Sequence, residues 1–124
     1  MKIRRLFFTF LLSLAAFQFC FSQEKPKAVL FEEFGNINCE ELLARMDAFY
    51  NVLSNDPSSQ GYIIIYGKGD ETVRKLSYEL LINGSIKFRN FDKSRIVRIR
   101  GAERENLEIE LWKVPAGAEK PVFS

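Results

Sequence analysis

The chain has 124 residues, of which 47% are hydrophobic and 27% charged, a composition typical of one small globular domain. It contains no histidine and only two cysteines, Cys20 and Cys39, which excludes a histidine-based catalytic site and a thiol-rich metal site. The formal net charge is +2, and without the three basic residues near the N-terminus it falls to −1. The remaining charge does not favour nucleic-acid binding.

Residues 1–22 have the pattern of a secretory signal peptide. Three basic side chains precede an apolar run over residues 6–17, which is shorter than the roughly 20 residues that span a bilayer. Cys20 and Ser22 are the small residues expected three and one positions before a cleavage site. We therefore expect a periplasmic or secreted protein with no membrane span after cleavage. An uncleaved signal anchor is the alternative. Lipid attachment at Cys20 is disfavoured, because Phe19 is not the small residue that such a site needs.

The mature chain begins with a polar spacer over residues 23–28, followed by a predicted strand over residues 29–34. Asn38 is a predicted helix N-cap, and Glu41 stands three residues later, as in a capping box. The helix is predicted to end near Ser54, before a loop rich in turn-forming residues. Its apolar stripe consists of Leu42, Leu43, Met46, Phe49, Tyr50 and Leu53.

The strand predicted over residues 62–66 is apolar throughout, which indicates burial on both faces in the middle of a sheet. Asp70 is the predicted N-cap of a second helix. This helix either breaks at Gly84 or continues to about Arg89. Its predicted apolar stripe consists of Val73, Leu76, Leu80 and Leu81.

Two strands complete the predicted domain, which covers residues 29–115. The first lies at residues 95–100 and the second at residues 107–114, where apolar and charged residues alternate before Pro115. The tail at residues 116–124 is predicted to be disordered. Right-handed crossovers place both helices on one face of one sheet, so the β-α-β-α-β-β order predicts an α+β fold, a two-layer α/β sandwich.

This order behind a signal peptide resembles the OmpA-like domain, a bacterial domain that holds the cell wall. The local similarities are an opening strand with Phe31, Phe34 and Gly35, the Asn-Asp-Pro loop at residues 55–57, the strand at 62–66, the segment at 91–96 and a closing strand. The run at residues 110–115 is similar to the end of other small exported bacterial proteins of uncharacterised function. The resemblance covers about residues 29–114 and implies an OmpA-like topology.

The resemblance also implies a ligand site. OmpA-like domains bind the diaminopimelate of peptidoglycan with an Asp after the second strand and an Arg on the second helix. Asp70 matches the Asp, although the usual Thr before it is Gly69. The residue at the expected place of the Arg, after Leu76-Ser77, is Tyr78. Arg74 is the candidate substitute, because a zwitterion needs both an anionic and a cationic partner.

Other candidates have both structural and functional interpretations. Glu108 and Glu110 share a strand face and suit either a solvated surface or an acid–base or Ca²⁺ site. If the last two strands pair, the basic cluster of Arg95, Arg98, Arg100 and Arg104 opposes these carboxylates; an anionic-ligand site is the alternative. Cys39 is either a small buried residue or a thiol activated at a helix N-terminus.

The aromatic residues Phe88 and Phe91 indicate a partner surface if they are exposed. Taken together, the sequence predicts a small exported, non-enzymatic binding domain of the cell envelope, whose partner is peptidoglycan or an envelope protein. A peptidoglycan tether that uses Asp70 is the first alternative, and an enzyme is the second. We expect no cofactor and no bound metal.

Overall fold

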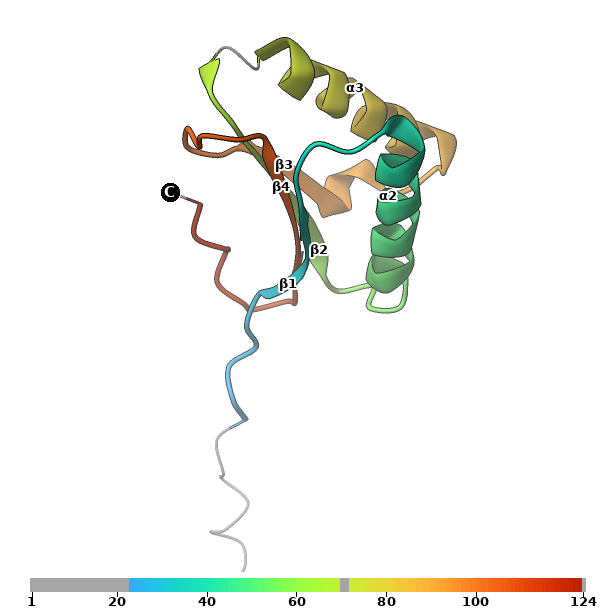
Figure 1. Cartoon of the computed structure of the whole chain (residues 1–124). Coiled ribbons are helices and arrows are strands. Elements are labelled where there is room, and N and C mark those ends of the chain that lie inside the picture. Colours follow the sequence, from blue (N-terminus) through green and yellow to red (C-terminus); the bar gives the residue numbers. More distant parts are fainter. Residues whose placement is uncertain (1–22, 70–71, 124) are drawn as a thin grey trace, which may run out of the picture.

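A computed structural model describes residues 23–69 and 72–123 of the chain (Figure 1). The predicted signal peptide at residues 1–22 lies outside this part. The elements are β1 (Val29–Phe34), α2 (Cys39–Ser54), β2 (Gln60–Tyr66), α3 (Thr72–Phe88), the 3₁₀ turn η3 (Lys93–Arg95), β3 (Ile96–Arg100) and β4 (Glu108–Val114). The predicted β-α-β-α-β-β order is confirmed, with the short 3₁₀ turn before β3 as an addition.

The four strands form one mixed sheet in the order β1-β4-β2-β3. Strand β4 pairs antiparallel with both β1 and β2, whereas β2 and β3 are parallel. The predicted central strand is therefore confirmed, because β2 lies between β4 and β3. Its residues Ile63 and Ile64, which point to opposite faces, are both completely buried.

Both helices cover the same face of the sheet, as Figure 1 shows, which confirms a two-layer α/β arrangement. The main core forms between the two helices and the sheet, where Ile63 and Ile65 of β2 pack among side chains of α2 and α3. Gly61 allows α2 to approach β2 closely. A Cβ atom at Gly61 would lie 2.7 Å from Leu53 and 3.0 Å from Phe49.

Helix α2 begins where its capping residue predicts. The Asn38 side chain accepts a hydrogen bond from the Glu41 backbone N–H at 2.8 Å. The Glu41 carboxylate accepts from Arg45 at 2.6 Å, and Arg45 also contacts Glu32 of β1. These ion pairs link the exposed edge of the helix to the first strand.

Helix α3 differs from the prediction in the face that it buries. It runs without a break through Gly84, and its buried side chains are Tyr78, Ile82, Ser85 and Ile86. The predicted stripe is wrong for three of its four members, because Val73, Leu76 and Leu80 are exposed and only Leu81 packs against the core.

Polar contacts select the buried face of α3. The Tyr78 hydroxyl bonds to Asn36 and to the backbone of Ile37, and the Ser85 hydroxyl lies 2.6 Å from that of Tyr50. Both hydroxyl groups are satisfied inside the domain, so a face with two polar side chains packs inward. The spacing of apolar residues along the sequence does not predict this buried face, because two of its side chains are polar.

The loop between β3 and β4 and the C-terminal segment lie on the sheet face opposite the helices (Figure 1). Pro121 of this segment is buried, and Glu119 contacts Lys25 at 3.4 Å. The disorder predicted for residues 116–124 stays a prediction. Tyr62, Ile64 and Tyr66 point away from the helices and are nevertheless buried, so this second face of the sheet is also covered.

Candidate functional site

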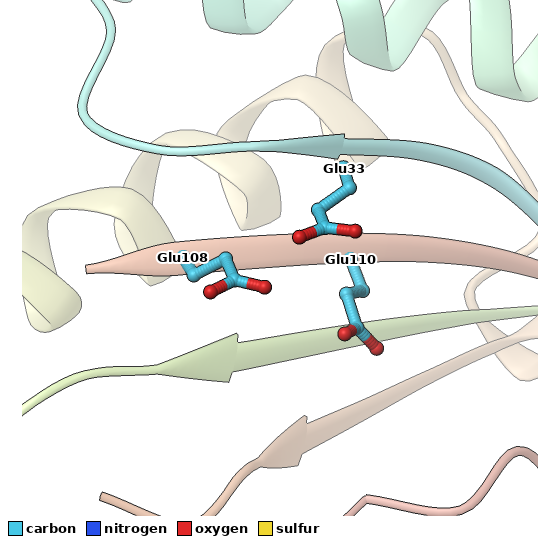
Figure 2. Close-up of side chains that lie close together, drawn as sticks. All are labelled: Glu33, Glu108 and Glu110. Atoms are coloured by element: carbon cyan, nitrogen blue, oxygen red, sulfur yellow. The ribbon is translucent and has the colours of Figure 1, made fainter. Parts of the chain in front are cut away.

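An acidic cluster lies on the sheet face opposite the helices. It consists of Glu33 on β1 with Glu108 and Glu110 on β4, and Figure 2 shows the three side chains. The β1–β4 register places Glu33 opposite Glu110. Each residue offers one carboxylate oxygen, and these three atoms lie within 4.8 Å of one another. Sequence analysis placed Glu108 and Glu110 on one face but missed Glu33, because its proximity depends on strand pairing.

Arg104, from the loop before β4, supplies the countercharge of the acidic cluster. Its guanidinium contacts Glu108, lies 3.3 Å from Glu110 and covers the Tyr66 ring at 3.4 Å from the ring centroid. Glu110, which is 7% exposed, also accepts from the Tyr66 hydroxyl at 3.2 Å and from Trp112 Nε1 at 2.8 Å. The buried carboxylate is therefore held by three donors of the domain itself.

The acidic cluster is better suited to structure than to metal binding. Carboxylate oxygens suit hard cations such as Ca²⁺, but a cation here would have to displace Arg104 from two of the three groups. The pKa of Glu33 is raised from its ordinary value by a hydrogen bond to Glu108 and by the negative charges of Glu108 and Glu110. Glu33 therefore takes up a proton at a higher pH than an isolated glutamate does.

The four arginines of the predicted basic cluster are separated in the structure. The condition for their pairing with Glu108 and Glu110 fails, since β2 lies between the last two strands. Arg104 alone meets the two carboxylates. Arg95 donates to the backbone carbonyls of Leu53, Asp56 and Ser59 and so fixes the loop between α2 and β2. Arg98 and Arg100 instead line a groove beside α3.

The groove between α3 and the edge strand β3, called the α3–β3 groove below, consists of two adjoining cavities of about 260 and 670 Å³ that share Asn83 and Arg98. The smaller cavity is lined by Ile63, Ile65, Glu79, Ile82, Asn83, Arg98, Ile99 and Arg100. The larger one adds Ile86, Lys87, Asn90, Phe91, Asp92, Lys93 and Ile96. Apolar side chains of the core thus form its floor, with charged side chains around the opening.

The charges of the α3–β3 groove are not balanced. Arg100 binds Glu79 through two hydrogen bonds of 2.9 and 3.1 Å, and this pairing, with a smaller contribution from Arg98, lowers the pKa of Glu79. Asp92 is occupied in accepting from the backbone and hydroxyl of Ser94. Within residues 23–69 and 72–123, no carboxylate lies within ion-pair distance of Arg98. Arg98 therefore acts on Glu79 only from a distance and has no ion-pair partner of its own among these residues.

The structure describes only one of the two ligand-binding residues that the OmpA-like resemblance predicts. Asp70 lies outside the described residues, and Arg74 is exposed in the first turn of α3. The preceding loop is tied to α3, because Lys75 donates to the Gly67 carbonyl at 2.6 Å and Thr72 contacts the Gly69 carbonyl. Ligand binding by Asp70 and Arg74 remains a prediction.

The other candidate residues have different surroundings. Cys39 is an exposed, free cysteine at the first position of α2, so the expectation of a buried residue is wrong. Phe91 stacks on Tyr50 with ring centroids 4.9 Å apart. Phe88, in contrast, is 81% exposed at the end of α3. The condition for a partner surface is met by Phe88 and not by Phe91.

No helix in the described ranges 23–69 and 72–123 is long and apolar enough to cross a membrane. Comparisons of the chain with protein-family models, with curated proteins and with solved structures found no match.

Proposed function

We propose that this chain is an exported, non-enzymatic binding domain of the cell envelope, a divergent relative of the OmpA-like domain. In this proposal the ligand is an acidic peptide segment of another envelope protein, and it binds in the α3–β3 groove. The observation that carries the proposal is Arg98, a guanidinium without a carboxylate partner among the described residues, beside a cavity with an apolar floor.

Two features favour a peptide as the ligand. Among the described residues, strand β3 pairs only with β2, so its other edge is open to an added extended segment. Arg98 lies on strand β3 and pairs with Ile63 of β2. Because Ile63 faces the helices, the Arg98 side chain also lies on the helix side of the sheet, where it lines the groove. A guanidinium binds a carboxylate in a planar, two-point geometry, which gives both affinity and orientation.

The OmpA-like relationship is supported by the confirmed element order and the two-layer α/β arrangement. In the alternative function the domain is a peptidoglycan tether that uses Asp70 with Arg74 as the substitute cation. The non-enzymatic part rests on the composition, which lacks histidine. A hydrolase screen tests this part of the proposal. If the protein turns over a substrate and Cys39→Ala or Asp70→Ala abolishes the turnover, the domain is an enzyme.

The proposal is tested with an array of immobilised acidic, neutral and basic peptides. The wild-type exported protein should prefer acidic peptides, and Arg98→Gln should lose this preference. Arg89→Gln is the matched control, because Arg89 pairs with Asp47 away from the groove. Equal binding to all three peptide classes, or unchanged binding by Arg98→Gln, would contradict the proposal.

A sedimentation assay with purified peptidoglycan tests the alternative. The wild type is compared with Asp70→Ala, Arg74→Ala and Arg98→Gln. If the protein sediments and only the first two variants lose sedimentation, the tether function replaces the acidic-peptide function.

A further inference from the structure

The outer face of α3 carries an apolar stripe that no part of the described domain covers. Val73 is 77% exposed, Leu80 is 70% exposed and Phe88 is 81% exposed, while Leu76 is less exposed. With 3.6 residues per turn, these residues lie along the side of the helix opposite to Tyr78 and Ile82. Monomeric proteins rarely leave such a continuous stripe in water. We call it the α3 seam.

The α3 seam has a hollow at its centre. Gly84 lies four residues after Leu80 and four before Phe88, and a Cβ atom at this position would meet nothing within 4 Å. A glycine inside a helix costs about 1 kcal/mol relative to alanine, and no contact within the domain accounts for it. Beside it lies a cavity of about 280 Å³ between α2 and α3, lined in part by Leu43, Leu80, Leu81 and Phe88.

We propose that the α3 seam binds a second copy of this chain in an antiparallel α3–α3 pair. In an antiparallel register with Leu80 of one copy opposite Gly84 of the other, the two-fold axis places the second Leu80 in the first Gly84 hollow. The same register places Leu76 opposite Phe88 twice. A surface with a protrusion and a matching hollow four residues apart is self-complementary, as a two-fold interface requires.

The charges of the α3 seam permit this pairing, and its size limits the strength of the dimer. Lys87, the charged residue within the stripe, is opposite Ser77 in this register, so the pairing brings no like charges together. The helix has 17 residues. At 1.5 Å per residue the helix is about 25 Å long, and at about 10 Å across two such faces bury on the order of 500 Å², the size of a weak, transient interface. A weak, concentration-dependent dimer is the expected result.

The dimer goes beyond the proposed function and occupies a different surface, since the α3–β3 groove lies on the flank of α3 that carries Glu79 and Asn83. An experiment can therefore contradict either proposal without affecting the other. Arg98→Gln should leave the dimer intact, and Leu80→Glu should leave acidic-peptide binding by each domain intact.

Sedimentation equilibrium of the exported protein between about 1 µM and 1 mM covers the expected range of dissociation constants. The wild type should change from monomer to dimer within this range, and Leu80→Glu should weaken the dimer at least about tenfold. Gly84→Leu should weaken it similarly while raising the stability of the monomer, since it fills the hollow and improves helix propensity. Val122→Glu removes an apolar residue that is 85% exposed on the tail and should leave the dimer unchanged.

Disulfide trapping tests the register in a Cys39→Ser background. A mixture of Leu80→Cys and Gly84→Cys proteins should form the mixed disulfide in preference to either homodimer. A wild type that stays monomeric at the highest concentration would overturn the proposal. So would a dimer that survives both Leu80→Glu and Gly84→Leu. A monomer that binds anionic lipid vesicles through Leu80 and Phe88 would assign the α3 seam to a membrane surface instead.

Discussion

Gly101 and Gly84 are glycines for opposite reasons. A Cβ atom at Gly101 would lie 2.2 and 2.3 Å from two atoms of the Tyr66 ring, which is itself completely buried under Arg104. At Gly84 the same atom would meet nothing within 4 Å. The first glycine therefore serves packing inside the domain, whereas the second leaves space at the surface.

These two positions give a matched prediction. Gly101→Ala should lower the free energy of unfolding by about 1–3 kcal/mol, because the Tyr66 ring and the backbone must move apart. Gly84→Ala should raise it by up to about 1 kcal/mol through helix propensity. Urea denaturation at low protein concentration, where association is negligible, measures both. The same sign for the two substitutions would contradict the described packing.

Glu33 sets a second prediction at the residue scale, because its pKa is raised by Glu108 and Glu110. A carboxyl group whose pKa is higher in the folded state than its ordinary value of 4.5 binds a proton more tightly after folding. Its contribution to stability therefore grows as the pH falls through the folded pKa toward 4.5, and it is lost as the pH rises. Glu33→Gln should be more stable than wild type at neutral pH and should show less loss of stability between pH 5 and pH 7.

Urea denaturation at these two pH values tests the Glu33 prediction. Glu24→Gln is the control, because Glu24 is exposed in the segment before β1 and lies outside the acidic cluster. Destabilisation of Glu33→Gln at pH 7 would show that the charged Glu33 supports the fold, contrary to the electrostatic argument.

At the scale of elements, the buried face of α2 was predictable from the sequence, and the buried face of α3 was not. Asn38 and the apolar stripe of α2 act together, so the cap and the buried face were both predictable. In α3 the apolar stripe and the buried face disagree. Tyr78 and Ser85 are buried because Asn36, Ile37 and Tyr50 lie within hydrogen-bond distance, and no pattern within α3 itself contains that information.

The N-cap of α2 gives a prediction at this scale. Asn38→Ala should lower the free energy of unfolding by about 1 kcal/mol, because the Glu41 backbone N–H loses its acceptor. Asn38→Asp should retain most of the stability, since a carboxylate oxygen accepts the same bond. Thermal unfolding of both variants by circular dichroism provides the comparison, and equal losses would show that the cap contributes little.

At the scale of the whole molecule, the element order was predictable and the arrangement of the strands was not. The sequence contains no direct signal that β4 lies between β1 and β2. Two consequences depended on that position: Glu33 joins Glu108 and Glu110, and Arg98 is separated from them. The acidic cluster was therefore only partly predictable, and the α3–β3 groove was not, because both are formed by residues distant in the chain.

The cover on the second sheet face gives the last prediction. Pro121→Asp should destabilise the domain by about 1–3 kcal/mol, because it buries an unpaired charge. Val122→Asp, at the adjacent and exposed position, should change stability by less than about 0.5 kcal/mol. Chemical denaturation distinguishes the two, and equal effects would show that the tail does not cover the sheet.

The position of β4 also determines when the domain can fold. Until residue 114 is available, β1 has no partner strand, and β2 has only its parallel pairing with β3. The final strand therefore completes the sheet from its middle, and a chain halted before it has no closed core. Such a chain lacks the strand that joins β1 to the rest of the sheet, so the first and the last strand of the domain depend on each other.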